Sequence, residues 1–235
     1  MQGISSVYKM FFDFHVHNIQ LAVEAKRLGY NGIALIQSSR SYNTPNNIAP
    51  IEDGFNIFSG IEIYAKNPED LKNKVQKFRE HNDVVIVNGG NIKVNRAACE
   101  DPRVDILAHP YKSRRDSGIN HILAKKASEN NVAIELSINS IIRTRLSLRA
   151  KILSQFRQIL KLQRKFKFPL IITSNAYSIY DLRTPEDIIA FADCLEMTPD
   201  EITSSLFKNP MDIIERSKIR KNVIVKGARI IEQDD

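Results

Sequence analysis

The sequence contains no tryptophan and only two cysteines, and none of its hydrophobic runs is long enough to cross a bilayer. A membrane helix needs about 18 or more apolar residues in succession, so the composition argues against a membrane-spanning protein. The N-terminus also lacks the pattern of a secretory signal. Cys99 and Cys194 stand far apart and form no Cys-x-x-Cys pair, which favours reduced thiols. We therefore expect a cytoplasmic protein that makes no contact with membranes.

Several motifs of nucleotide and acyl chemistry are also missing. No glycine-rich phosphate turn follows the first apolar segment, as a dinucleotide-binding fold would require, and no Gly-x-Ser-x-Gly elbow marks a serine hydrolase. No repeat of 20–50 residues and no low-complexity linker divides the chain. With 235 residues, of which 43% are hydrophobic, the chain can bury a sizeable core. We expect residues 1–235 to form a single domain with a basic, then acidic, tail.

Positive charge is concentrated in one segment. The whole chain has a net charge of +7, and residues 143–168 hold nine Lys and Arg with no Asp or Glu. The other residues carry 25 basic against 27 acidic side chains, a balance of −2. A charge pattern of this kind indicates one docking site for a polyanion, and nucleic acid is the first candidate.

The basic segment has the periodicity of an amphipathic helix that ends before Pro169. Its apolar residues recur at steps of three and four: Ile152, Leu153, Phe156, Ile159, Leu160 and Phe166. The basic residues fall on the remaining circumference: Lys151, Arg157, Lys161, Arg164 and Lys165. Like charges four residues apart repel by about 0.2–0.5 kcal/mol per pair, and a bound polyanion would relieve this repulsion. Two alternatives remain open, a solvated face whose aliphatic stems cover the core and a lipid-binding surface.

Short apolar segments alternate with longer helical patterns along the chain. We expect seven strands, at 10–15, 32–36, 57–63, 84–88, 106–109, 132–138 and 170–174. Most are rich in Val and Ile, which is typical of parallel strands covered on both faces. The alternation favours an α/β fold, an irregular TIM-like (β/α) barrel of about seven parallel strands. The region after Ala190 reads as purely helical, so we expect helices to close the barrel in place of an eighth strand.

The loops that follow the expected strands are basic and contain tyrosines. In a barrel these loops converge on one face, where function is normally carried. Basic and aromatic side chains together suit phosphate contacts and base stacking. The candidate RNA-binding residues are Arg40, Lys112, Arg114, Arg115, Arg143, Arg145, Lys151, Arg157, Lys161, Arg164, Lys165 and Arg183.

A set of histidines and acids ends several of the same strands. His15 and His17 lie two residues apart and project to one side of the first strand, Glu62 ends the third strand, and His109 ends the fifth. These four could converge as metal ligands. Their motifs resemble the PHP family of barrel metallo-phosphoesterases, which closes its metal site with Asp-x-His after the seventh strand. Here that place reads Ser174-Asn175-Ala176, so we expect a PHP-like barrel whose ligands are vestigial, with neutral imidazoles bonded to Asp13, Glu62 or backbone.

The incomplete site and the segment that follows it carry a second resemblance. Ser174-Asn175-Ala176, the run Leu182-Arg183-Thr184-Pro185-Glu186-Asp187-Ile188 and the opening Phe12-Asp13-Phe14-His15-Val16-His17 resemble the archaeal and eukaryal ribonuclease P protein component 3 family. That family usually has Gly where Asn175 stands, and Asn tolerates the left-handed backbone region better than most residues. The resemblance spans nearly the whole chain.

The resemblance implies a protein subunit of ribonuclease P, the ribonucleoprotein endonuclease that removes 5′ leaders from precursor tRNA. It implies ribonuclease P RNA, the component 2 protein and other holoenzyme subunits as partners, with precursor tRNA met indirectly. The chemistry would belong to the RNA and its bound Mg²⁺, with no cofactor held by the protein. Two other hypotheses stay open: a metal-dependent PHP-type phosphoesterase using His15, His17, Glu62 and His109, and an RNA-binding factor outside ribonuclease P.

Overall fold

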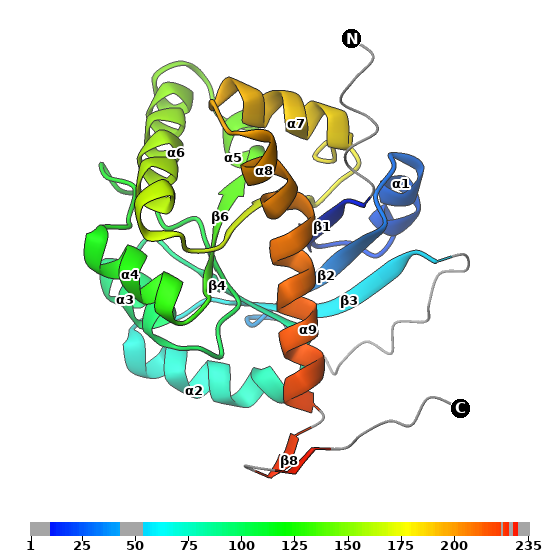
Figure 1. The fold of residues 1–235 in the computed structure, drawn as a ribbon, viewed down its shortest axis with the longest axis vertical. Helices are drawn as coiled ribbons and strands as arrows, with labels where there is room; N and C mark the ends of the chain where they lie inside the picture. The colour runs from blue at the N-terminus through cyan, green and yellow to red at the C-terminus, as the bar shows by residue number, and fades with distance from the viewer. Residues whose placement is uncertain (1–9, 43–53, 222, 226–227, 230–235) are drawn as a thin grey trace.

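The molecule is built around a sheet of seven parallel strands that curls into a barrel (Figure 1). The computed structural model describes residues 10–42, 54–221, 223–225 and 228–229. The strands pair in the order of the chain, and all seven expected strands are confirmed to within a few residues. They are β1 (Phe12–Val16), β2 (Gly32–Ser38), β3 (Asn56–Ile63), β4 (Val84–Asn88), β5 (Ile106–Ala108), β6 (Ala133–Ser137) and β7 (Leu170–Thr173).

The barrel closes between its first and last strands through only a few contacts. Val16 and Ala176 form a single parallel bridge. The backbone N–H of His17 donates to the Ala176 carbonyl at 2.8 Å, and the N–H of Ala176 donates to the His15 carbonyl at 2.9 Å. The segment η2 (Ser204–Lys208), a π-helix, contacts both β1 and β7. Helical structure therefore stands where an eighth strand would lie, as the sequence predicts.

Two hydrophobic cores result from this arrangement. Side chains inside the barrel, such as Phe14, Ile36 and Ile86, are fully buried. Phe207 and Ile213, from the C-terminal helical region, pack against them and fill the interior. The apolar faces of the outer helices cover the other side of the sheet. Because both faces are covered, the strands can be apolar throughout, which explains their Val and Ile content.

The remaining elements alternate with the strands or follow them. They are α1 (Leu21–Arg27), α2 (Pro68–Phe78), η1 (Arg79–His81), α3 (Ile92–Glu100), α4 (His121–Glu129), α5 (Ile138–Ile142), α6 (Leu146–Phe166), α7 (Pro185–Cys194), α8 (Pro199–Thr203), α9 (Asn209–Lys221) and the strands β8 (Val223–Val225) and β9 (Ala228–Arg229). In the described part of the chain, no helix has the length and apolarity to span a membrane.

The capping signals in the sequence are mostly realised. Asn67 and Thr184 each accept a hydrogen bond from a first-turn N–H, and Thr198 forms a capping box with Glu201. Asn18 is a residue type that often begins a helix, but it does not cap α1. Its side chain accepts from the N–H of Gln20 within a turn, and α1 begins only at Leu21.

The basic segment 143–168 is not a single helix. A short helix, α5, ends at Ile142, and α6 starts at Leu146 after a corner in which Leu146 takes a left-handed φ of 46°. The Arg149 guanidinium donates to the carbonyls of Ile141 and Thr144 and so satisfies the end of α5. At its other end, α6 stops at Phe166, where Lys167 is left-handed with φ of 58°. Pro169 lies beyond this cap.

Candidate functional site

The histidines and acids of the sequence meet at the carboxyl end of the barrel. His15 on β1 lies at the centre of the group. Its Nδ1 is 2.6 Å from Oε1 of Glu135 on β6, and its Nε2 is 4.0 Å from Oε2 of Glu62 on β3. His109, which follows β5, places Nε2 3.7 Å from Oε2 of Glu135. Two overlapping trios, His15–His109–Glu135 and His15–His17–Glu62, each bring their ligand atoms within 4.8 Å of one another.

The pairing between His15 and Glu135 makes this a buried ion pair. Burial alone would lower the pKa of His15, but the charge of Glu135 and its hydrogen bond raise that pKa to about 9. Burial would likewise raise the pKa of Glu135, and the charges of His15 and His109 instead lower it to about 2. The expectation of neutral imidazoles bonded to Asp13, Glu62 or backbone is therefore wrong for His15. It is an imidazolium whose hydrogen-bond partner is Glu135, because this carboxylate lies inside the barrel at hydrogen-bond distance.

Asn175 fills the space between the other two imidazoles. Its Oδ1 is 2.9 Å from Nε2 of His17, and its Nδ2 is 3.1 Å from Nε2 of His109. An amide can do this only if His17 carries its proton on Nε2 and His109 carries none there. Burial lowers the pKa of both rings, that of His17 to about 4, so both are neutral at pH 7. Asn175 has φ of 52°, which fits the tolerance of Asn for this region.

These contacts leave few atoms for a metal ion. Glu62 accepts hydrogen bonds from Tyr64 and Asn88, each at 2.6 Å, and Asn175 occupies Nε2 of two imidazoles. Among the fully buried side-chain atoms of the cluster, Nε2 of His15 and Oε2 of Glu135 are the two that lack a hydrogen bond in the described part of the chain. A two-metal hydrolytic centre needs more open ligand atoms than these two. The residues present therefore do not fit such a centre.

The ion pair predicts how stability changes with pH. The pKa of His15 is higher in the folded protein, about 9, than its ordinary value of 6.5. Its stabilising contribution is therefore complete below pH 6.5 and is lost as the pH rises through 9, with a slope of up to about 1.4 kcal/mol per pH unit. Urea unfolding between pH 6.5 and 9 should show this decline. An exposed-histidine control, His121→Gln, should show the same decline, whereas a flat profile for the natural chain would contradict the charge assigned to His15.

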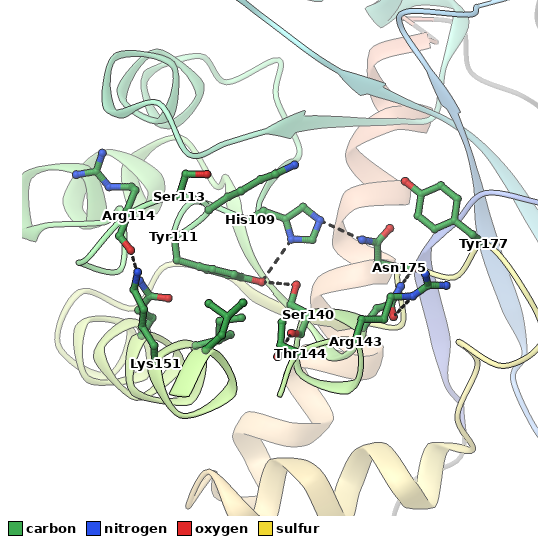
Figure 2. A pocket seen from close by; sticks show the side chains of 15 residues that line it. His109, Tyr111, Ser113, Arg114, Ser140, Arg143, Thr144, Lys151, Asn175 and Tyr177 are labelled. Atoms are coloured by element: carbon green, nitrogen blue, oxygen red, sulfur yellow. Dashed lines mark hydrogen bonds between the residues drawn. The ribbon is translucent and has the colours of Figure 1, made fainter. Parts of the chain in front are cut away.

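A pocket of about 510 Å³ opens beside this cluster (Figure 2). Its walls come from the loop after β5, from α5, from the first turns of α6 and from the loop after β7. His109 and Asn175 belong both to the cluster and to the lining of the pocket, where Figure 2 shows them in contact with each other. Four cationic side chains line it, and no acidic side chain does: Lys112, Arg114, Arg143 and Lys151. The site is thus an electropositive cavity next to a closed histidine cluster.

The twelve predicted RNA-binding residues fall into three groups according to the contacts that their side chains make within the protein. Three arginines form ion pairs within the chain: Arg114 with Asp116, Arg143 with Asp181, and Arg164 with Glu201. Three others contact the protein differently: the Arg40 guanidinium lies over the Tyr64 ring, Lys165 lies near the Phe166 ring, and Arg183 donates to backbone carbonyls. Within the described residues six have no ion pair and no side-chain hydrogen bond: Lys112, Arg115, Arg145, Lys151, Arg157 and Lys161. Their contact with RNA stays a prediction.

Sequence reasoning missed three residues that shape the site. Glu135 is a lone acid within an apolar strand, a pattern that indicates a buried partner, but it does not belong to the ligand set expected from the motifs. For Asn175 the sequence suggests a backbone conformation and not a side-chain contact. Tyr177 stacks on His17 with ring centroids 3.9 Å apart and planes 14° apart, and no local pattern indicates this contact.

Solved structures first define the class of fold. An amidohydrolase superposes with a TM-score of 0.58 at 8% identity, covering 90% of this chain and 75% of that one. A Xaa-Pro dipeptidase superposes with a TM-score of 0.58 at 10% identity, covering 89% and 76%. At such identities the likeness concerns the fold alone. The chain is an α/β barrel of the TIM-like class, as the sequence predicts.

Sequence comparison then identifies the family. Residues 10–222 match the family described as RNase P subunit p30. Ribonuclease P protein component 3 of Methanothermobacter thermautotrophicus is 46% identical, covering 95% of this chain and 96% of its own. The same component of Methanosarcina mazei is 39% identical, covering 96% and 97%. A chain in the cryo-EM structure of archaeal ribonuclease P with mature tRNA superposes with a TM-score of 0.80 at 30% identity, covering 95% and 99%. The protein belongs to the ribonuclease P subunit p30 family.

Proposed function

We propose that this chain binds ribonuclease P RNA through its cationic surface, and that the RNA subunit and its bound Mg²⁺ catalyse the cleavage of the substrate RNA. As a member of its family, the chain is a protein subunit of ribonuclease P, the endoribonuclease that processes the 5′ end of tRNA. Its proposed binding partners are ribonuclease P RNA, the component 2 protein and the other holoenzyme proteins. It meets precursor tRNA indirectly and works in the cytoplasm. We expect the protein itself to bind no cofactor.

The basic face of α6 is the observation that carries this proposal. At about 100° per residue, Lys151, Arg157, Lys161 and Lys165 fall within one sector of roughly 120°. All four are exposed, and no ion pair with an acid involves them in the described residues. From Lys151 to Lys165 the helix rises by about 21 Å. A row of unpaired cations of this length suits the spaced phosphates of an RNA backbone.

The closed histidine cluster supports the second half of the proposal. Asn175 stands between His17 and His109, and His15 is held by Glu135. The imidazoles and carboxylates therefore bind one another or Asn175. Their contacts hold β1, β6 and the loop after β7 together at the mouth of the barrel. A stabilising protein needs such cross-strand contacts, whereas a phosphoesterase needs open ligand positions.

Reconstitution tests the proposed function directly. The chain, its component 2 partner and ribonuclease P RNA are combined, and removal of the leader from precursor tRNA is assayed at low Mg²⁺. We expect cleavage that depends on the RNA and is greatly reduced when this chain is omitted. If omission makes no difference, the chain has no role in holding the catalytic RNA. RNA-free protein that cleaves precursor tRNA would contradict the division of labour.

A paired substitution at the cluster provides a second prediction. His17→Gln with Glu62→Gln removes one imidazole and one carboxylate charge while keeping side-chain size and hydrogen bonding close to the original. We expect the activity of the reconstituted holoenzyme to stay within a few-fold, because these side chains position the barrel mouth and touch no reacting atom. Circular dichroism verifies folding of the variant. Complete loss of cleavage by a folded variant would mean that the cluster takes part in catalysis.

A further inference from the structure

We infer that the pocket beside the histidine cluster receives one unstacked nucleotide of single-stranded RNA, with its phosphate against Lys112 and Lys151 and its base against Tyr177. This inference rests on the proposed function and adds a defined ligand to it. The volume of about 510 Å³ lies within the range of roughly 300–1,000 Å³ that small-ligand sites occupy. A single nucleotide fits such a space, whereas a double helix can only lie across its opening.

The charge of the pocket selects an anion. Lys112 and Lys151 are exposed lining residues, and within the described part of the chain neither ammonium group has a hydrogen bond or an ion pair. Arg143 lines the same space. Its Nε and Nη2 bind Asp181 and Asn139, which leaves Nη1 outside those contacts and fixes the guanidinium in place. The two free ammonium groups can donate to a phosphate, and the held guanidinium adds positive charge to the same cavity.

An aromatic face at the edge of the pocket selects a base. Tyr177 is 51% exposed, although one face of its ring is stacked on His17. The stacking fixes the ring, and about half of the residue's surface remains accessible to a planar group. Figure 2 shows Lys151 and Arg114 at one end of the pocket, and Arg143 and Tyr177 at the other. A base splayed out of a single strand can stack on such a ring.

The walls of the pocket are held before any ligand arrives. Gln155 is buried at 2% exposure, and its Nε2 donates to the carbonyls of Arg114 and Asp116, which ties α6 to the loop after β5. The Tyr111 hydroxyl donates to Oγ of Ser140 at 3.0 Å and joins that loop to α5. A cavity fixed in this way loses little conformational entropy when it is filled.

The basic face of α6 leads into the pocket. Lys151 belongs both to this row of cations and to the pocket lining. A single strand whose phosphates follow Lys165, Lys161 and Arg157 along the helix therefore arrives at the pocket at the N-terminal end of α6. The surface that binds the backbone and the cavity that takes one nucleotide form one continuous path.

Ultraviolet crosslinking of the reconstituted complex tests the inference. The chain, its protein partner and ribonuclease P RNA are irradiated, and crosslinked peptides are mapped by mass spectrometry. We expect Tyr177 to crosslink to one nucleotide. Tyr177→Leu should abolish this crosslink and weaken RNA binding by about tenfold, and Tyr177→Phe should restore affinity. Lys112→Gln with Lys151→Gln should weaken binding by a similar factor. The matched control, Tyr180→Leu, changes a 79% exposed tyrosine outside the lining and should leave affinity unchanged.

A second arm separates RNA from free nucleotides as the source of the ligand. The riboside 5′-monophosphate of 2-aminopurine is titrated into the RNA-free protein complex, and quenching of its fluorescence reports stacking. One outcome is that the fluorescence is quenched, that Tyr177→Leu abolishes the quenching, and that the RNA complex gives no crosslink. In that case the pocket binds free nucleotides and not a nucleotide of the RNA. Absence of both quenching and crosslink overturns the inference. If RNA still binds with strong salt dependence in that case, the proposed function stands alone, and if RNA does not bind, the proposed function fails as well.

Discussion

Replacing the four cations on the basic face of α6 by glutamine should reduce the slope of log K against log[salt] for RNA binding by about three. Lys151→Gln, Arg157→Gln, Lys161→Gln and Lys165→Gln keep helix propensity and most of the aliphatic stems. Each phosphate contact contributes about 0.7–0.9 to the slope of log K against log[salt]. Loss of four contacts therefore lowers the slope by about three. The affinity lost between 50 and 200 mM salt then shrinks by a factor on the order of a hundred. Filter binding or fluorescence anisotropy over a salt series measures both quantities.

A matched variant distinguishes the effect of the position of these cations from the effect of net charge. Lys72, Lys77, Lys125 and Lys218 are exposed on other helices, and changing all four to glutamine removes the same total charge. We expect this control to leave the slope within about one of the natural value, because long-range attraction is screened beyond about 10 Å at 0.1 M salt. Equal losses in the two variants would show that net charge alone drives binding. An unchanged slope in the α6 variant would exclude the helix from RNA contact.

Removing the charge of Glu135 should destabilise the fold strongly. Glu135→Gln leaves the His15 imidazolium without its counterion inside the barrel, where Glu135 and His15 are both fully buried. Breaking a buried pair by removing one partner costs about 3–5 kcal/mol. For a chain of this size that loss lowers Tm by roughly 10 °C. Calorimetry or urea unfolding of the purified chain at pH 7 measures the change.

Two further variants show that burial causes the effect. Glu129→Gln removes an acid that pairs with Lys126 on the surface of α4, and exposed pairs of this kind contribute about 1 kcal/mol or less. The double change His15→Phe with Glu135→Leu replaces both charges by apolar groups and should recover part of the lost stability. If Glu135→Gln is as stable as Glu129→Gln, the buried ion pair is not a main support of the barrel mouth.

The strands could be predicted from sequence because burial on both faces leaves a local signature. Each of the seven is a short apolar run, and the run from Val84 to Asn88 matches the observed strand at both ends. The helical region after Ala190 could also be predicted from sequence. Its packing against β1 and β7 explains why a barrel of seven strands can close. The break between α5 and α6 could not be predicted, since a three-residue corner interrupts a periodicity that continues on both sides.

The candidate site could be predicted from sequence only in part, because its contacts join residues that are distant in sequence. Arg143 meets Asp181, 38 positions away, and Arg164 meets Glu201, 37 positions away. Local charge counts therefore treated these arginines as free, although internal acids hold them. Likewise, the choice of Glu135 over Glu62 as the partner of His15 depends on strand positions across the barrel. Residue type predicted that these groups would gather, and only the fold determines which of them pair.

The distinction between held and free cations refines the RNA-binding prediction. Arg164 is engaged by Glu201 and by the Glu196 carbonyl, so its removal should affect the packing of α6 on α8 as well as any RNA contact. Lys151, Arg157 and Lys161 have no such partner among the described residues. The face of α6 that they share is the part of the surface on which RNA binding should depend most strongly.

The magnesium dependence of precursor tRNA cleavage shows whether the cations of α6 stabilise the catalytic RNA. Cleavage rates are measured across a Mg²⁺ series for ribonuclease P RNA alone, for RNA with the natural protein complex, and for RNA with the complex that carries the four α6 substitutions. We predict that the natural complex lowers the Mg²⁺ midpoint, that the α6 variant moves it back toward that of RNA alone, and that rates at saturating Mg²⁺ are similar for all three. The same midpoint with and without the natural complex would contradict stabilisation of the RNA by this protein.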